Sequence, residues 1–254
     1  AGNDMIEGTV GDDQILADAG EDLVTAFAGN DTIFGGSGLD TIYGGSGTDV
    51  IYGNQNQDQL FGNDDNDTLY GGQQDDTVLG QDGDDVLYGN MSTDVINGGN
   101  GADTLFGGQA TDYLSGGAGD DVIDGEGDDD TLYGQAGNDA LSNGTGSAAT
   151  TLDGGTGNDT LTGSDVADLV LTGGTGDDVF DLSAVITNED HSITDFESAG
   201  AVVGDTITLA AAKTTATTAA GADLAIGTIT AVQGTEETAY GAFASGASNT
   251  IDLL

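Results

Sequence analysis

An aspartate recurs every nine residues, without interruption, from Asp4 to Asp139 of this chain. Each is followed two residues later by isoleucine, leucine or valine. A fixed short period is typical of a chain built from stacked structural units, because one short unit cannot bury its apolar side chain alone. The sixteen aspartates of the series are Asp4, Asp13, Asp22, Asp31, Asp40, Asp49, Asp58, Asp67, Asp76, Asp85, Asp94, Asp103, Asp112, Asp121, Asp130 and Asp139.

The repeated unit reads G-G-x-G-x-D-x-U-x, where U is aliphatic, as in residues 35–43. Six glycine-rich turn residues and three strand residues exclude a helix. Successive units are expected on opposite sides of a solenoid, so that two units form one turn and the aliphatic side chains of two sheets meet in a thin core. Glycine occupies the first position of every unit from Gly35 to Gly134, and we expect a positive φ there.

The charge of the chain is extreme, with 46 acidic residues, a single basic residue (Lys213) and a formal net charge of −45. This excludes a nucleic-acid-binding protein, because the phosphate backbone requires a basic surface. High net charge alone favours disorder, but here the acids are phased to aliphatic residues. Stacked turns would place the phased aspartates about 4.8 Å apart, so they require a bound cation.

The available ligands favour calcium. The chain has no cysteine and one histidine, so zinc and copper lack their preferred ligands. Carboxylates and the carbonyls of a glycine-rich turn suit calcium, which takes about 6 to 8 oxygen ligands. One such aspartate could be a turn former bonded to its own backbone, but sixteen in phase favour metal binding. We therefore expect folding to depend on calcium.

The fourth position of the unit differs between the two edges of the predicted solenoid, so we expect one uniform row of metal sites and one altered row. One edge carries Gly11, Gly29, Gly47, Asp65, Gly83, Gly101, Gly119 and Gly137. The other carries Gly2, Gly20, Gly38, Asn56, Gln74, Ser92, Ala110 and Asp128.

The unit resembles the RTX (repeats-in-toxin) nonapeptide, the repeat of proteins exported by type I secretion systems, over residues 1 to about 210. The resemblance implies an all-β fold: a right-handed parallel β-roll with 18 residues per turn, a C-terminal cap and a small C-terminal β-rich region. It also implies calcium ions between neighbouring turns of one edge. Second- and fourth-position carbonyls and the sixth-position aspartate of one turn would face first-, third- and fifth-position groups of the next. One ion would join Gly99, Gly101 and Asp103 to the turn that begins at Gly116.

Further residues are predicted as ligands on the same resemblance. Beyond the sixteen, the aspartates are Asp159, Asp168, Asp178 and Asp195. The glycines are Gly36, Gly38, Gly45, Gly47, Gly99, Gly101, Gly117, Gly119, Gly155, Gly157, Gly174 and Gly176.

We predict four segments along the chain. Residues 1–142 form the roll, and residues 143–151 form a register-breaking loop in which Thr150 replaces the aspartate. Residues 152–209 form the last turns and the cap. Residues 210–254 resemble an uncleaved type I secretion signal, and a small C-terminal subdomain is the alternative. The chain enters the repeat in mid-unit and shows no N-terminal signal and no apolar run of about 18 residues, so we expect a fragment of a longer protein.

The last turns are predicted from pairs of an aspartate and an inward apolar residue. The cap is predicted at residues 192–196 and 204–209, and His191 beside it is expected to be an exposed loop residue rather than a catalytic one. The pairs are Asp159 with Leu161, Asp168 with Val170 and Asp178 with Phe180.

Aromatic residues are predicted to form a ladder on the outer face of one sheet, and this ladder is a possible interface. Three interpretations remain open: simple support of the strands, a packing surface for a neighbouring molecule, or a platform for sugar rings. The ladder consists of Phe34, Tyr52, Tyr70, Tyr88 and Phe106.

The sequence contains no catalytic arrangement of residues, and we expect no enzyme activity. The first functional hypothesis is the C-terminal part of a type I secreted structural protein, such as a surface-layer or coat component. The alternatives are an RTX module of a secreted enzyme or toxin (a protease, lipase or polysaccharide-modifying enzyme) whose catalytic domain is missing, and a carbohydrate-binding module.

All three hypotheses share a switch that unfolds the chain at cytosolic calcium and folds it outside the cell. Expected partners are calcium, the type I secretion machinery and, for a surface protein, further copies or cell-surface polysaccharide. Nucleic acid and membrane insertion are not expected.

Overall fold

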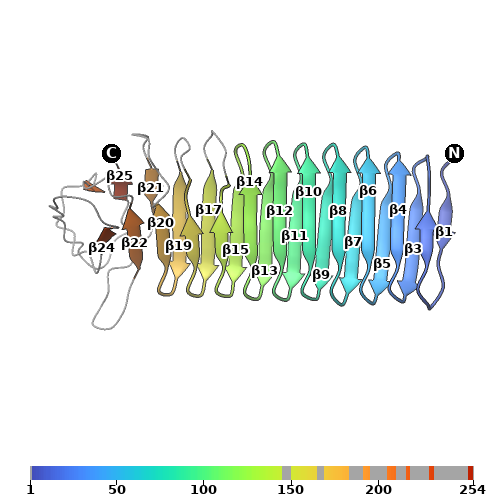
Figure 1. The fold of residues 1–254 in the computed structure, drawn as a ribbon, viewed down its shortest axis with the longest axis horizontal. Helices are drawn as coiled ribbons and strands as arrows, with labels where there is room; N and C mark the ends of the chain where they lie inside the picture. The colour runs from blue at the N-terminus through green and yellow to red at the C-terminus, as the bar shows by residue number, and fades with distance from the viewer. Residues whose placement is uncertain are drawn as a thin grey trace.

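The computed structural model describes residues 2–144, 150–164, 169–182, 191–194, 205–209, 216–217, 229–231 and 251–253. These residues form strands, turns and bends, and none of them lies in a helix. Accordingly, no described segment is a helix that could cross a membrane. The strands stack into a rod, with the N-terminal strands at the blue end of Figure 1.

Two sheets run along the rod, and the chain alternates between them strand by strand. The odd sheet contains, in spatial order, β1 (Met5–Glu7), β3 (Leu23–Ala28), β5 (Thr41–Ser46), β7 (Gln59–Asp64), β9 (Thr77–Asp82), β11 (Val95–Asn100), β13 (Tyr113–Ala118), β15 (Thr131–Ala136), β17 (Thr151–Thr156), β19 (Val170–Thr175), β21 (His191–Ile193), β25 (Ile251–Leu253) and β23 (Ala216–Thr217). The even sheet contains β2 (Gln14–Leu16), β4 (Thr32–Ser37), β6 (Val50–Gln55), β8 (Thr68–Gln73), β10 (Val86–Met91), β12 (Thr104–Gln109), β14 (Val122–Glu126), β16 (Ala140–Ser142), β18 (Thr160–Thr162), β20 (Val179–Leu182), β22 (Thr206–Leu209) and β24 (Ile229–Ala231).

The register between neighbouring strands confirms the predicted parallel β-roll. Ile42 pairs with Leu60, which lies 18 residues later. The offset rises to 20 where Leu132 pairs with Leu152, because Leu152 follows the inward Leu141 by eleven residues instead of nine. Pairing is parallel throughout the roll. Among the described strands, the antiparallel pairs are those that β25 forms with β21 and with β23.

The strands are longer than the three residues that the repeat predicts. Most contain six residues, as β5 does, because the first three positions of the next unit continue the strand. The first-position glycine is one of these, and it points inward like the aliphatic residue before it. Each unit therefore devotes only its fourth to sixth positions to the turn.

The core is a single column of aliphatic side chains between the sheets. Burial of one such side chain stabilises the fold by about 1.5–3 kcal/mol relative to its exposure. The residues with no exposed surface include Val24, Ile33, Ile42, Ile51, Leu60, Leu69, Val78, Leu87, Ile96, Leu105, Leu114, Leu132, Leu152 and Leu161.

The predicted pairing of Asp168 with Val170 is wrong in register. Leu171, not Val170, pairs with Leu152 and has no exposed surface. The residue two before it, Leu169, is also fully buried and occupies the aspartate position of that turn. Asp168 itself lies outside the described residues. Three consecutive apolar residues, Leu169, Val170 and Leu171, made the inward position ambiguous in sequence.

Candidate metal centres

The sixth-position aspartates form two columns, one along each edge of the roll. In both columns the backbone N–H of an aspartate donates to Oδ1 of the aspartate one turn later, as from Asp94 to Asp112 at 2.8 Å. The odd column precedes the strands of the odd sheet and runs through Asp4, Asp22, Asp40, Asp58, Asp76, Asp94, Asp112 and Asp130. The even column runs through Asp13, Asp31, Asp49, Asp67, Asp85, Asp103, Asp121, Asp139, Asp159, Asp178 and Asp205.

The second carboxylate oxygen of these aspartates is buried and unsatisfied. From Asp22 to Asp139, and again at Asp159, Oδ2 has almost no exposed surface and accepts no hydrogen bond. A buried carboxylate oxygen without a partner is costly, because it has lost its hydration and gained nothing in return. Such oxygens, repeated along two columns, fit a bound cation.

The first-position glycine is explained by this carboxylate and not by a positive φ, so that prediction is wrong. The backbone of Gly98 lies outside the positive-φ region. A Cβ on Gly98 would lie 2.2 Å from Oδ2 of Asp103, and one on Gly80 would lie 2.2 Å from Oδ2 of Asp85. Glycine is required there because the aspartate side chain folds back over it.

Positive φ is found instead at the second and fourth positions. Gly99 and Gly101 have φ of 119° and 131°. Their carbonyls point along the roll, since a Cβ on Gly117 would lie 2.2 Å from the oxygen of Gly99 and one on Gly119 would lie 1.9 Å from that of Gly101. The described backbone and side chains donate no hydrogen bond to the carbonyl of Gly101, which leaves that oxygen available.

The oxygen atoms available to a cation therefore come from both side chains and backbone. Among the described residues, no three His, Cys, Asp or Glu side chains converge as a metal site. A cation in these turns must take backbone carbonyls as well as aspartate oxygens, and an all-oxygen set of this kind fits calcium. The predicted group Gly99, Gly101 and Asp103 comes from one turn, as the resemblance implies.

The residue at the fourth position decides the hydrogen bonding of the turn, and Gly20 of the odd edge still donates to the third-position carbonyl of Ser37 at 2.9 Å. On the even edge, Gly101 and Gly119 each donate a 2.8 Å bond to the third-position carbonyl of the following turn. On the odd edge, the side chains that replace glycine keep a positive φ but at smaller values, for example 79° at Ser92 and 80° at Ala110. In this described part of the roll, neither Ser92 nor Ala110 makes the corresponding bond. A Cβ cannot occupy the place that glycine has there, so the turn rotates.

A second ladder on the even edge was not predicted. Fifth-position side chains accept from the backbone N–H one turn later, as from Ala102 to Oδ1 of Asp84 at 2.8 Å and from Asn138 to Oδ1 of Asp120 at 2.7 Å. This direction is opposite to that of the sixth-position bonds. The recurrence of Asp and Asn at the fifth position of alternate units was the available signal.

Burial raises the pKa of the column carboxylates. The pKa of Asp58 rises to about 8, mainly through burial, partly offset by the N–H of Asp40 and reinforced by the carboxylates of Asp76 and Asp40. The pKa values of Asp67 and Asp94 also rise to about 8 for the same first reason. Without a cation, much of each column would therefore hold protons at neutral pH.

The columns end differently. Thr150 and Leu169 take the next two positions of the odd column, so the described part of that column carries no carboxylate beyond Asp130. The even column continues to Asp205, which is 3 % exposed and accepts from the N–H of Asp178 at 3.0 Å. Asp205 was not among the predicted ligands, although Asp205 and Ile207 repeat the aspartate-aliphatic spacing. The predicted ligand Asp195 lies outside the described residues.

The aromatic ladder is present on the even sheet. The rings of Tyr52 and Tyr70 are 4.8 Å apart and parallel within 4°, and those of Tyr70 and Tyr88 are 4.7 Å apart and parallel within 5°. Phe34 and Phe106 extend the stack at either end with centroids 4.9 Å from their neighbours.

Comparison with known families agrees with this geometry. The family model described as the RTX calcium-binding nonapeptide repeat (4 copies) matches residues 1–26, 25–60, 61–96, 70–105, 93–114, 106–141 and 144–168. Together these matches cover more than half of the chain. No curated protein matches it.

Proposed function

The chain belongs to the RTX calcium-binding nonapeptide repeat family, whose repeats are typical of type I secreted proteins, and on that premise we propose that it is the calcium-folded part of an extracellular surface protein. It binds calcium through its repeats. The proposed role is structural, as in a surface layer or coat, with the roll acting as a stiff rod.

The observation that carries this proposal is the pair of buried aspartate columns with unsatisfied Oδ2 atoms. Residues such as Asp85, Asp103 and Asp121 present one carboxylate per turn, and each accepts a hydrogen bond from the aspartate N–H of the turn before. Bound calcium would supply the positive charge that lets neighbouring carboxylates stay ionised inside the fold. The second- and fourth-position carbonyls would complete its coordination.

The same columns support a folding switch. At low calcium, carboxylates stacked about 4.8 Å apart either repel one another or must take up protons at a pH well above their unfolded pKa of about 3.9. Both disfavour the fold, so the chain favours an extended, unfolded state that a secretion channel can accept. At the higher calcium outside the cell, binding and folding become one event. In this proposal residues 210–254, most of which lie outside the described residues, are recognised by the type I secretion machinery.

The second candidate is a folding and secretion module of a secreted enzyme or toxin. The β-roll is a calcium-binding fold rather than a catalytic one, so any chemistry would come from another domain. Filament or sheet formation by this chain in calcium would favour the surface-protein role, and a monodisperse rod in calcium would favour the module.

Circular dichroism tests the switch. We expect strand signal in calcium and its loss in chelator. The double variant Asp103→Asn with Asp121→Asn should need a higher calcium concentration to fold. The control, Asp64→Asn with Asp82→Asn, removes the same charge from exposed strand positions and should fold like the parent. Full strand content in chelator at neutral pH would refute the proposal.

A further inference from the structure

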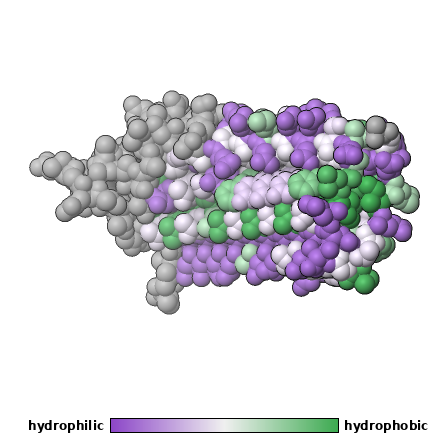
Figure 2. All heavy atoms as spheres, turned by 45° about the vertical axis from the view of Figure 1, so that its right-hand side comes forward, coloured by the Kyte–Doolittle hydropathy of each residue, from purple (hydrophilic) through white to green (hydrophobic). Residues whose placement is uncertain are grey.

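Part of one face of this acidic rod carries no charge. The strands β4, β6, β8, β10 and β12 are neighbours in the even sheet and contain no acidic or basic residue. We call their outward side the neutral strip. It ends at Asp18 toward the N-terminus and at Asp124 and Glu126 toward the C-terminus. Figure 2 shows a pale and green band running along the rod between hydrophilic rows. A sequence with a net charge of −45 thus leaves a continuous uncharged surface across five neighbouring strands.

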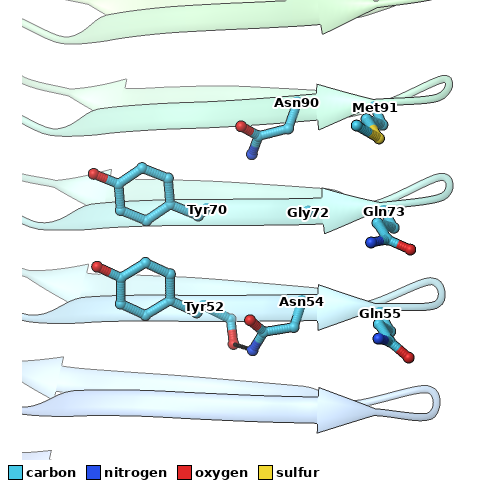
Figure 3. Close-up of a pocket in the computed structure, with 8 residues that line it drawn as sticks. All are labelled: Tyr52, Asn54, Gln55, Tyr70, Gly72, Gln73, Asn90 and Met91. Carbon is cyan, nitrogen blue, oxygen red and sulfur yellow. Dashed lines mark hydrogen bonds between the residues drawn. The ribbon is translucent and has the colours of Figure 1, made fainter.

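The stacked tyrosines give the neutral strip an open aromatic surface. The ring centroids are 4.8 Å apart, which exceeds the roughly 3.5–4.0 Å of carbon contact. The parallel rings are therefore stacked with a lateral offset. Figure 3 shows the rings of Tyr52 and Tyr70 broadside, with their hydroxyl groups pointing the same way. Part of each ring face therefore stays accessible.

A hollow of about 410 Å³ lies beside these rings. Gly72 forms its floor, Asn54 and Asn90 stand on the strands on either side, and Gln73 lies at its far end (Figure 3). The second position alternates along the strip as Gly36, Asn54, Gly72, Asn90 and Gly108, so glycine gaps recur every second strand, about 9.5 Å apart.

The polar groups of the hollow are held in place. Nδ2 of Asn54 donates to the carbonyl of Tyr52 at 3.1 Å, and Nδ2 of Asn90 donates to that of Tyr88 at 3.5 Å. These bonds orient both amides and leave their Oδ1 atoms as acceptors. With the tyrosine hydroxyls and the exposed Gln55 and Gln73, the neutral strip offers donors and acceptors beside aromatic rings, as sugar-binding surfaces do.

We propose that the neutral strip binds a linear, uncharged polysaccharide laid along the axis of the roll. An uncharged ligand fits a surface without charge, whereas an anionic polymer would be repelled by the acidic turns on both sides. An extended chain of pyranose rings repeats at a spacing close to that of the strands, so every second ring meets an equivalent set of groups. The hollow has the size of ordinary ligand sites.

A second copy of the chain is a poorer occupant. Five strands of six residues present roughly 500 Å² of surface, compared with about 800 Å² per partner in a stable complex. Face-to-face contact would also bring two highly acidic rods together. The proposal does not depend on the surface-protein role, since a module of a secreted enzyme could carry the same strip.

Affinity electrophoresis in calcium tests the proposal with matched polymers. The neutral probes are hydroxyethylcellulose, galactomannan and mixed-linkage glucan, and the anionic counterpart is carboxymethylcellulose. We expect at least one neutral polymer to retard the protein and the anionic one to leave its mobility unchanged. Absence of retardation by all three neutral polymers, or equal retardation by carboxymethylcellulose, overturns the proposal.

Two variants locate the site. Gly72→Asn fills the hollow with the residue that Asn54 and Asn90 already carry at the same position, at φ of 79° and 81°. We expect at least a tenfold loss of affinity. Its control, Val95→Asn, places the same amide at an exposed position of the odd sheet, outside the predicted calcium ligands, and should bind normally. Equal binding by the two variants overturns the proposal.

The double variant Tyr70→Ser with Tyr88→Ser removes ring surface without touching glycine. Its control is Tyr43→Ser in the odd sheet, where the ring of Tyr43 stacks on that of Phe61 with centroids 4.6 Å apart. Circular dichroism in calcium establishes that each variant folds. We expect the double variant to lose binding while Tyr43→Ser keeps it. Sedimentation measures whether the variants of the neutral strip self-associate differently from the parent. If self-association changes while polysaccharide binding stays intact, the face binds copies of the chain and the proposal is overturned.

Discussion

The backbone N–H of Asp85 donates a 2.8 Å hydrogen bond to Oδ1 of Asp103, one full turn further along the roll. Each carboxylate is thus held by the turn before it, while its other oxygen lies over the glycine of its own turn. The aspartate is at once a link between turns and a buried charge. The stability of one turn is therefore coupled to the ionisation of its neighbours.

Acidification should partly replace calcium. An unfolded aspartate has a pKa of about 3.9, whereas burial raises the pKa of Asp58 and Asp94 to about 8 and that of Asp103 to about 6 in the metal-free fold. The folded state then binds more protons than the unfolded state between these values, so stability is present at low pH and is lost as pH rises through about 6 to 8.

Circular dichroism in chelator should show strand signal growing as pH falls from 8 toward 5, which is still above the isoelectric point of about 4.1. With saturating calcium the signal should stay constant over the same range. A metal-free chain whose strand signal instead grows on raising the pH would contradict the assignment of these pKa shifts to the folded state.

Gly98→Ala should destabilise the roll by about 1–3 kcal/mol, as overpacking does, because its Cβ would collide with Oδ2 of Asp103. The control is Gly127→Ala, since a Cβ there would meet only the carbonyl oxygen of Gly108, at 3.6 Å. Urea unfolding in calcium measures both. Equal midpoints for Gly98→Ala and the parent would show that the carboxylate is not confined by glycine.

The two edges should differ in calcium affinity. Asp94 and Asp103 lie in consecutive units, are buried to the same degree and make the same 2.8 Å bond, but only Asp103 lies on the edge that keeps glycine at the fourth position. We expect Asp103→Asn to raise the calcium midpoint of folding more than Asp94→Asn does. Titration followed by circular dichroism gives both midpoints, and the reverse order would refute the ranking of the edges.

Ala110→Gly should improve the altered edge. Ala110 has a φ of 80°, a conformation that costs a residue with a Cβ about 1–2 kcal/mol. We expect higher stability in calcium and a lower calcium midpoint. Ala118→Gly is the control, because Ala118 has no positive φ and its loss of Cβ should destabilise by about 0.5–1 kcal/mol. Destabilisation by both variants would mean that the odd-edge turn does not relax toward the glycine form.

Much of the architecture could be predicted, because the inward residue, the turn and the period all recur in phase. The inward positions from Ile42 to Leu132 follow directly from the aspartate-aliphatic spacing. The reason for the first-position glycine could not be predicted, since the contact between Gly98 and Asp103 depends on how the side chain folds back across the turn. The register near Leu169 failed for a different reason, because three consecutive apolar residues competed for one inward position.

The hydrogen-bond ladder of the fifth-position side chains could be predicted only in part from the sequence. Its members Asp84 and Asp120 are outwardly ordinary turn residues, and only stacking shows that each accepts from the next turn. The prediction of one altered edge rests on residue types and agrees with the missing backbone bonds at Ser92 and Ala110. The predicted difference in metal binding between the edges stays a prediction.

The uneven ends of the two columns also determine how the chain finds its frame. Turns between Asp31 and Asp139 are so alike that sliding the chain by a full turn would leave every aliphatic residue inward, unlike a slip by one residue, which turns the strand over. Sheet pairing alone therefore cannot determine which turn lies beside which. Thr150 and Leu169 mark the register of the strands, because only one pairing of the strands keeps aspartate out of the positions where the odd column has threonine and leucine.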